Sequence, residues 1–177
     1  MKTYSSQFAF VGLFASFLLT GCVSQFTPKE ITPSSLNVTN KHPATVLVGV
    51  TGGGKVDSVY FNVENQTLQD AIADSITNSG FFSRAVTVGN ADYQLDVLLV
   101  LLKQPGDGFT LTGGARMIWK LTRLQDHKQV FQDEIVTECR QTVGDHLVAS
   151  TRARAAVAGS IQKNIQEGIE KMSNTSF

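Results

Sequence analysis

Three extended segments in the second half of the chain constrain its fold more than any other feature. Across 93–102, hydrophobic side chains recur at every second position, which is the period of a strand that buries one face. Two further strand-like segments follow at 115–124 and 130–140, after a glycine-rich loop and a polar turn. Because hairpin connections join antiparallel neighbours, these segments are expected to form a three-stranded meander.

Helices are expected on both sides of the meander. A short strand at 45–50 comes first, and a helical hydrophobic period follows it and stops at Gly80. After the meander, hydrophobic residues recur every four positions, which predicts a long helix from Asp145, as its N-cap, to Met172. This order predicts one domain, at 44–177, of the α+β class: a two-layer sandwich with two helices on one face of a mostly antiparallel sheet of four to five strands.

The start of the chain has the composition of an export signal. Lys2 supplies a positive charge, and Phe8–Thr20 is an uncharged, mostly hydrophobic run of 13 residues. As a helix this run would be roughly 20 Å long at ~1.5 Å per residue, which is shorter than the ~30 Å hydrocarbon core of a bilayer. A signal peptide at 1–21, removed after export, is therefore favoured over a membrane-spanning helix.

The residues that end this segment are Leu19-Thr20-Gly21-Cys22. They resemble the lipobox of bacterial lipoproteins, in which an aliphatic residue and two small residues precede a cysteine that is acylated. The resemblance implies that Cys22 carries fatty acids and is the first residue of a membrane-anchored protein. Val23, rather than aspartate, implies sorting to the outer membrane, facing the periplasm. The alternative is an ordinary secreted protein in which Cys22 forms a disulfide.

A flexible tether is expected between the anchor and the domain. The segment 22–43 holds three prolines and many Ser, Thr and Asn residues, without a helical period. A coil of this length spans on the order of 25 Å. If Cys22 is acylated, Cys139 has no intramolecular disulfide partner. Cys139 is then either a small buried hydrophobic residue or, alternatively, a reactive thiol or an intermolecular disulfide partner.

Two short motifs match parts of known catalytic motifs, but the other residues that those motifs require are missing. Gly49–Lys55 fits the first seven positions of a phosphate-binding Walker A loop, but Val56 stands where a magnesium-binding hydroxyl is required. Ser160-Ile161-Gln162-Lys163 matches the S-x-x-K motif of penicillin-binding proteins, but it lies inside the predicted terminal helix and its partner motifs K-T-G and S-D-N are missing. Both matches are attributed to chance.

No enzyme chemistry is indicated by the remaining polar residues. His42, His127 and His146 are expected in the tether, a turn and a helix start, where solvated histidines are common. Neither a metal site nor a cofactor is expected. The formal charge is zero and no basic stripe is visible, which argues against nucleic acid as a partner.

A possible partner surface is expected on the sheet. If both helices cover the face that carries Leu95, then Leu98, Val100, Leu102 and Ile118 point to the other side. An open antiparallel face is normally polar, so this cluster requires a cover. The cover is either a part of the same chain or, alternatively, a protein partner, a second copy or an acyl chain.

The mature chain resembles several groups of small envelope lipoproteins with a βαβββα-type domain. They are the lipopolysaccharide-transport lipoproteins, the auxiliary lipoproteins of ABC-type lipid transporters and the lipoprotein activators of peptidoglycan synthases. The resemblance is carried by the lipobox, by Ala91-Asp92-Tyr93-Gln94-Leu95, by Trp119-Lys120-Leu121 and by the helix after Arg152. It implies a non-enzymatic accessory or assembly factor of the cell envelope that binds a protein or lipid partner.

Two other functions remain open from the sequence. One is a small periplasmic hydrolase or nucleotide-dependent enzyme, which would bring Lys55, Asp107 or His146 together with carboxylates in one cavity. The other is a structural lipoprotein without a specific ligand.

Overall fold

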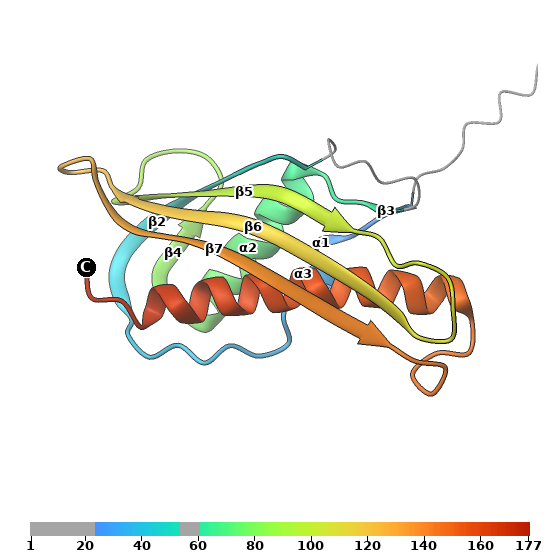
Figure 1. Ribbon diagram of the computed structural model, residues 1–177. Helices are drawn as coiled ribbons and strands as arrows, with labels where there is room; N and C mark the ends of the chain where they lie inside the picture. The colour runs from blue at the N-terminus through green and yellow to red at the C-terminus, as the bar shows by residue number, and fades with distance from the viewer. Residues whose placement is uncertain (1–23, 54–60) are drawn as a thin grey trace, which may run out of the picture.

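A five-stranded mixed sheet forms one layer of the domain (Figure 1). The computed structural model describes residues 24–53 and 61–177. The strands, in their order across the sheet, are β4 (Phe82–Val86), β2 (His42–Thr51), β5 (Tyr93–Lys103), β6 (Leu111–Arg123) and β7 (Lys128–Gln141). β5, β6 and β7 form the expected antiparallel meander, whereas β2 runs parallel to both β4 and β5.

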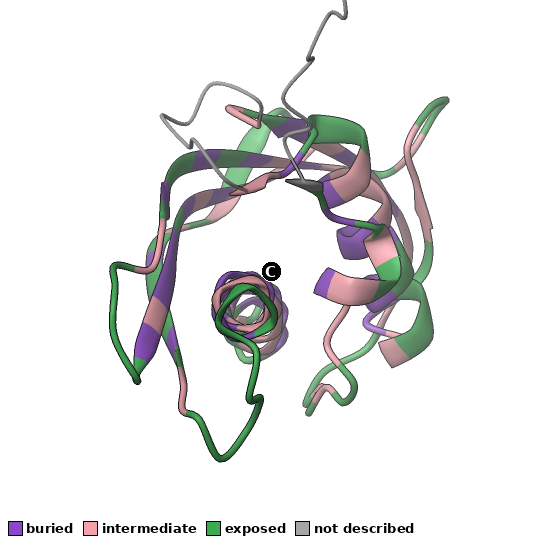
Figure 2. Cartoon of the chain, turned by 90° about the vertical axis from the view of Figure 1, so that its right-hand side faces the viewer, coloured by how far each residue is buried: buried purple, intermediate pink, exposed green. Residues whose placement is uncertain are grey.

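Two helices pack on one face of this sheet and form the second layer. α2 (Asn65–Ser79) lies against β2 and β4, and α3 (Ala149–Ser173) lies against β6 and β7. Figure 2 looks along α3 and shows that the sheet curves around this helix. The hydrophobic core therefore lies between the concave face of the sheet and the helices. The expected two-layer α+β sandwich is confirmed.

The end of α2 agrees with the position expected from the sequence, whereas the start of α3 does not. α2 stops as expected at Gly80, whose φ of 68° is the left-handed conformation that glycine adopts at little cost. α3 begins three residues later than expected, at Ala149, with Val148 instead of Asp145 as the N-cap. The N-cap expectation for Asp145 is wrong because its carboxylate instead accepts hydrogen bonds from the backbone N and Oγ1 of Thr142, at 2.7 and 2.8 Å, in the preceding turn.

The expected tether is part of the folded domain over the range that the structure describes. β1 (Ser24–Gln25) pairs in parallel with β3 (Phe61–Asn62), and the four-residue helix α1 (Pro28–Ile31) follows β1. Phe26 is 4% exposed and Ile31 is 0% exposed, so both belong to the core. The expectation of a flexible tether at 22–43 is therefore wrong from residue 24 onward, because burying these side chains and pairing this backbone offsets the chain entropy that favours a coil.

A buried polar contact ties α3 to the middle of the sheet. The Nε1 of Trp119, on β6, donates to Oδ1 of Asn164, on α3, at 3.0 Å. Gly168 lies one helical turn further on, and a Cβ there would meet the Trp119 ring at 2.6 Å. Glycine at this position lets the helix approach the indole ring closely.

Candidate functional site

The convex face of the sheet carries the surface that the sequence suggested. Leu98 and Val100 on β5 are each 42% exposed, and Ile118 on β6 is partly exposed. The cross-strand register places Leu98 directly opposite Ile118. A hollow of about 300 Å³ lies beside this pair, between β2, β5 and β6. None of the helices in 24–53 and 61–177 packs on this side, so these three side chains form an apolar patch on the convex face.

Leu102 does not belong to this patch. It is 2% exposed and packs in the core, whereas its neighbour Leu101 is 48% exposed. The cause is an irregularity in the β5–β6 pairing between Leu99 and Leu101, where one extra residue shifts the alternation of side chains by one position. The expectation for Leu102 is therefore wrong, and Leu101 takes its place on the convex face.

A further member of this face, Val136 on β7, was missed by the sequence reasoning. It is 62% exposed and sits at the outward position between Glu134 and Glu138. The signal was present, since Val136 interrupts a run of polar residues at every second position of β7. We call Leu98, Val100, Leu101, Ile118 and Val136 the convex patch.

Charged side chains lie among those of the convex patch. Among the described residues, two ion pairs on this face join neighbouring strands, Lys120–Asp96 at 3.4 Å and Arg116–Glu134, and a third, Lys103–Glu138 at 2.7 Å, reaches from β5 to β7 across Gly114 of β6. All of these side chains are close to half exposed, so each pair contributes little to stability. The face therefore combines apolar and charged side chains: Arg116 lies between Leu101 and Val136, and Glu134 lies opposite Ile118.

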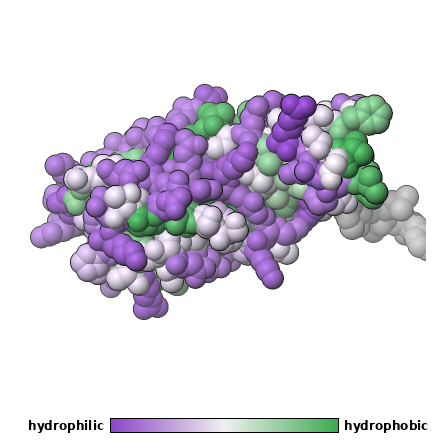
Figure 3. Space-filling model, turned by 90° about the horizontal axis from the view of Figure 1, so that it is seen from below, coloured by the Kyte–Doolittle hydropathy of each residue, from purple (hydrophilic) through white to green (hydrophobic). Residues whose placement is uncertain are grey.

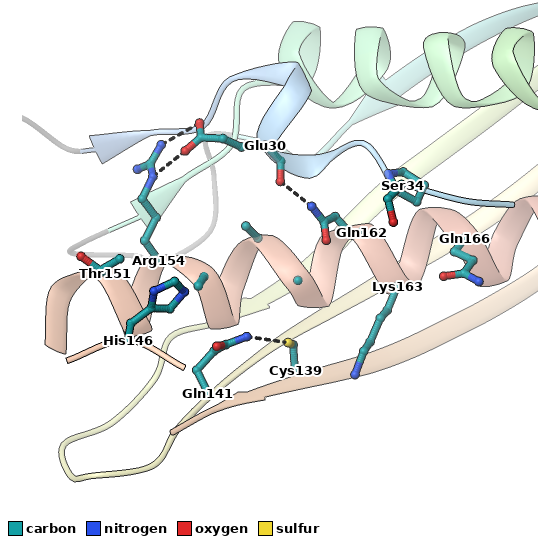
Figure 4. Close-up of a pocket in the computed structure, with 14 residues that line it drawn as sticks. Glu30, Ser34, Cys139, Gln141, His146, Thr151, Arg154, Gln162, Lys163 and Gln166 are labelled. Carbon is teal, nitrogen blue, oxygen red and sulfur yellow. Dashed lines mark hydrogen bonds and ion pairs between the residues drawn. The ribbon is translucent and has the colours of Figure 1, made fainter. Parts of the chain in front are cut away.

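A second concave region lies between α3, the end of β7 and the segment around α1 (Figure 4). Its volume is about 580 Å³, and its lining includes Glu30, Cys139, His146, Arg154 and Lys163. Cys139 is 8% exposed, and its Sγ accepts a long contact from Nε2 of Gln141 at 3.7 Å. This burial favours the interpretation of Cys139 as a small hydrophobic residue.

The strongest polar feature of this groove is an ion pair that holds the N-terminal segment. The guanidinium of Arg154, on α3, contacts both carboxylate oxygens of Glu30, at 2.8 and 3.0 Å, and also donates to the backbone oxygen of Gln25 at 2.7 Å. Arg154 in addition lies 4.6 Å from the ring centroid of Phe26. The hydrogen bonds from Arg154 are the largest cause that lowers the pKa of Glu30 to about 2. We call these contacts of Arg154 with Gln25, Phe26 and Glu30 the N-terminal clamp.

Asp107 and His146, two of the residues considered for an enzyme site, line different concave regions. Asp107 lines a cavity beside Phe61 and the start of α3, whereas His146 lines the groove with Arg154. Lys55 and Val56, and with them the end of the Walker-like loop, lie outside the described residues, as do the signal peptide at 1–21 and Cys22. Ser160 of the S-x-x-K match is fully buried, and its Oγ donates to the backbone oxygen of Val157 at 2.7 Å.

His42 differs from the expected solvated histidine. It opens β2 and stacks against the ring of Phe177, with centroids 4.4 Å apart, and against Phe82 at 5.5 Å. Burial in this aromatic cluster lowers the pKa of His42, since the charged imidazolium loses hydration there. His42 therefore packs in an aromatic cluster, and it lines neither of the two concave regions described above.

The described residues offer neither a metal site nor a membrane-spanning helix. Between residues 24–53 and 61–177, His, Cys, Asp and Glu side chains form no group of three or more that could hold a metal ion. Across the same ranges, no helix combines the length and the apolar character needed to cross a bilayer.

Known proteins resemble this chain in structure but not in sequence. No family model and no curated protein sequence matches it. A Xanthomonas campestris protein of the DUF330 family shares the fold with a TM-score of 0.57 and 11% identity, covering 84% of this chain and 94% of its own. A candidate lipoprotein of Caulobacter crescentus gives a TM-score of 0.45 at 11% identity, with 72% and 84% covered. A minor lipoprotein of Acinetobacter baumannii gives 0.41 at 8% identity, with 75% and 92% covered. At these identities the likeness concerns the fold.

Proposed function

We propose that this chain is a lipid-anchored lipoprotein of the bacterial outer membrane that faces the periplasm and acts as a non-enzymatic accessory factor. The observation that carries the proposal is that the folded domain begins two residues after Cys22, with Ser24 paired to β3. A lipid on Cys22 would therefore fix the domain itself at the membrane surface.

The N-terminal clamp supports an anchoring role for this segment. Arg154 contacts Gln25, Phe26 and Glu30, and Gln162 on the next turns of α3 donates to the backbone oxygen of Glu30 at 2.8 Å. Any pull on a lipid at Cys22 would pass through these contacts to the long helix. A chain that needs only to be retained at a membrane has no use for such a rigid connection, whereas a protein that presents one surface in a fixed orientation does.

The surface presented is the convex patch, and the partner we propose is another protein of the envelope. Exposed hydrophobic side chains interspersed with ion-paired ones, such as Arg116 between Leu101 and Val136, suit a protein partner that offers both apolar and charged groups. An acyl chain would instead require an enclosed apolar cavity, and the hollow beside Leu98 and Ile118 is shallow and bordered by Asp96 and Lys120. The accessory function is thus the binding of a protein to a membrane-fixed sheet.

The test combines mass spectrometry with photo-crosslinking in living cells. The mass of the protein purified from membranes is expected to show acyl chains on Cys22. A photoreactive residue at Val100 or Val136 is expected to capture one and the same protein, while the control position Val88, which is more exposed at 81% and lies outside the patch, captures none.

A substitution inside the patch makes the result specific. Leu98→Glu adds a charge at the centre of the patch and is expected to abolish the adduct at both positions. A lipid adduct, adducts that survive Leu98→Glu, or no adduct at all would contradict the proposed protein partner, and the last outcome would favour a purely structural lipoprotein. An unmodified Cys22 would refute the anchor.

A further inference from the structure

Two loops at one end of the domain expose large hydrophobic side chains. Phe109, in the loop between β5 and β6, is 84% exposed. Leu147 and Val148, in the loop between β7 and α3, are 85% and 61% exposed, and Val143 in the same loop is 37% exposed. These side chains are too isolated to form a core of their own, and they lie outside the convex patch.

This end of the domain is also the end at which the N-terminal segment enters the fold. Ser24 pairs with Phe61, and the backbone oxygen of Phe61 accepts a hydrogen bond from Nε2 of Gln104, at the base of the Phe109 loop, at 3.3 Å. One cavity is lined by Phe61, by the loop 104–108 and by the first turn of α3. Figure 3 shows hydrophobic side chains gathered at one end of the domain.

We propose that the loops 104–110 and 142–148 insert their apolar side chains into the membrane beside the lipid anchor, so that this end of the domain rests on the bilayer. The inference rests on the proposed acylation of Cys22. Two peptide units separate Cys22 from Ser24, so their Cα atoms lie at most about 7 Å apart. A lipid at Cys22 therefore brings these loops to the depth of the lipid headgroups, where exposed Phe and Leu side chains leave water for the acyl boundary.

The charge of the two loops specifies the kind of contact. Within 104–110 and 142–150 there are two aspartates, Asp107 and Asp145, and neither lysine nor arginine. Attraction to anionic lipids usually depends on clusters of basic residues, which these loops lack. The contact is therefore apolar, and it forms on zwitterionic lipids and persists at high salt.

The opposite end of the domain supplies a matched control. β5 has 11 residues and runs from the loop before Tyr93 to the loop that carries Phe109, which separates the two loops by about 35 Å at ~3.3 Å per residue. Val88 precedes β5 and is 81% exposed, close to the exposure of Phe109. It differs from Phe109 and Leu147 in its distance from the anchor, not in its accessibility.

The experiment measures depth with a fluorescent label. Phe109→Cys, Leu147→Cys and Val88→Cys are purified from membranes as acylated full-length protein, labelled with an environment-sensitive dye and reconstituted into phosphatidylcholine vesicles that contain brominated lipid. Unsubstituted protein reports labelling of Cys139, which is buried. Mass spectrometry of each sample reports whether Cys22 is acylated.

We expect blue-shifted, quenched emission at positions 109 and 147 and unquenched, water-like emission at 88, with no change on adding salt. Acylated protein with water-like emission at all three positions would overturn the inference and leave the proposed anchor intact. Water-like emission at positions 109 and 147 is also the result expected if the loops bind a protein instead of lipid. An unmodified Cys22 would refute both, and the mass separates the two failures.

Discussion

At the scale of single residues, Asn164 is the polar side chain on which the core depends most. It is fully buried, and its amide accepts from Trp119 and donates to the backbone oxygen of Ile135 at 2.8 Å. Asn164→Ala leaves the indole N–H and a strand carbonyl without their partner in the core, so we expect a loss of about 1–3 kcal/mol in the free energy of unfolding. Urea denaturation measures the loss. Gln166→Ala, on the partly exposed side of the same helix, serves as the control and should change stability far less.

His42 makes stability depend on pH in a defined window. Because burial lowers its pKa in the folded state, the unfolded chain binds a proton at higher pH than the folded chain does. The contribution of neutral His42 is thus complete above the ordinary pKa of 6.5 and is lost as pH falls below it. We expect His42→Leu to flatten this part of the curve of unfolding free energy against pH.

The control for His42 is the exposed His127, whose φ of 54° is a conformation that asparagine tolerates. The His127→Asn protein, which keeps His42, should still lose stability as pH falls below 6.5. A His42→Leu protein that still loses stability between pH 6.5 and 5 would contradict a role for this imidazole.

Residue-level prediction from the sequence fails where an apolar run hides a local irregularity. Leu98 to Leu102 is hydrophobic throughout, so the run does not mark which side chains face the helices. The outward position of Leu98 and Val100 follows from the alternation that starts at Tyr93. The shift in pairing after Leu99, which buries Leu102 and exposes Leu101, depends on the geometry of the β5–β6 pair and has no counterpart in the sequence.

At the scale of elements, the N-terminal clamp predicts that acid releases α1. The pKa of Glu30 falls from 4.5 to about 2 on folding, so the contribution of the charged carboxylate is complete above pH 4.5 and is lost as pH falls toward 2. Glu30→Gln removes the charge at every pH. We expect faster amide hydrogen exchange across residues 25–32 in Glu30→Gln at neutral pH, with unchanged exchange in β5 and β6.

An exposed ion pair provides the comparison. Glu138→Gln breaks the contact with Lys103 on the convex face, where both side chains are more than half exposed. It should leave exchange at residues 25–32 unchanged, since that contact lies away from α1. Equal protection of residues 25–32 in Glu30→Gln and the unsubstituted protein would show that Phe26 and Ile31 hold the segment without Arg154.

The long elements were predictable because their side-chain periods are regular, and the N-terminal segment was not because its apolar residues are sparse. β5, β6, β7 and the two long helices all occur within a few residues of their expected positions. Phe26 and Ile31 are separated by polar residues and a proline, a pattern typical of a coil. One local signal was present: Thr27-Pro28-Lys29-Glu30 has the spacing of a capping box, and the backbone N of Thr27 donates to Glu30 at 2.8 Å.

At the scale of the whole molecule, the proposed acylation of Cys22 would couple two surfaces, the apolar loops and the convex patch, to one point on the membrane. The apolar loops lie next to this point, the long axis of α3 extends away from it, and the convex patch faces sideways along β5 to β7 (Figure 1). A protein arranged in this way presents its sheet at a fixed height and angle above the bilayer. Contact of the loops with the bilayer should then depend more on the length of the connection between Cys22 and β1 than on the chemistry of the lipid.

A flexible insertion tests this coupling directly. Twenty Gly and Ser residues placed between Val23 and Ser24 let the domain move by about 25 Å and lower the effective concentration of the loops at the bilayer. We expect acylation and unfolding free energy to stay the same, while lipid quenching of a label at Phe109 decreases. The same insertion after Phe177 should leave the quenching unchanged. Undiminished quenching with the N-terminal insertion would mean that the loops hold the bilayer by their own affinity, and that the direct entry of the chain into β1 serves the fold alone.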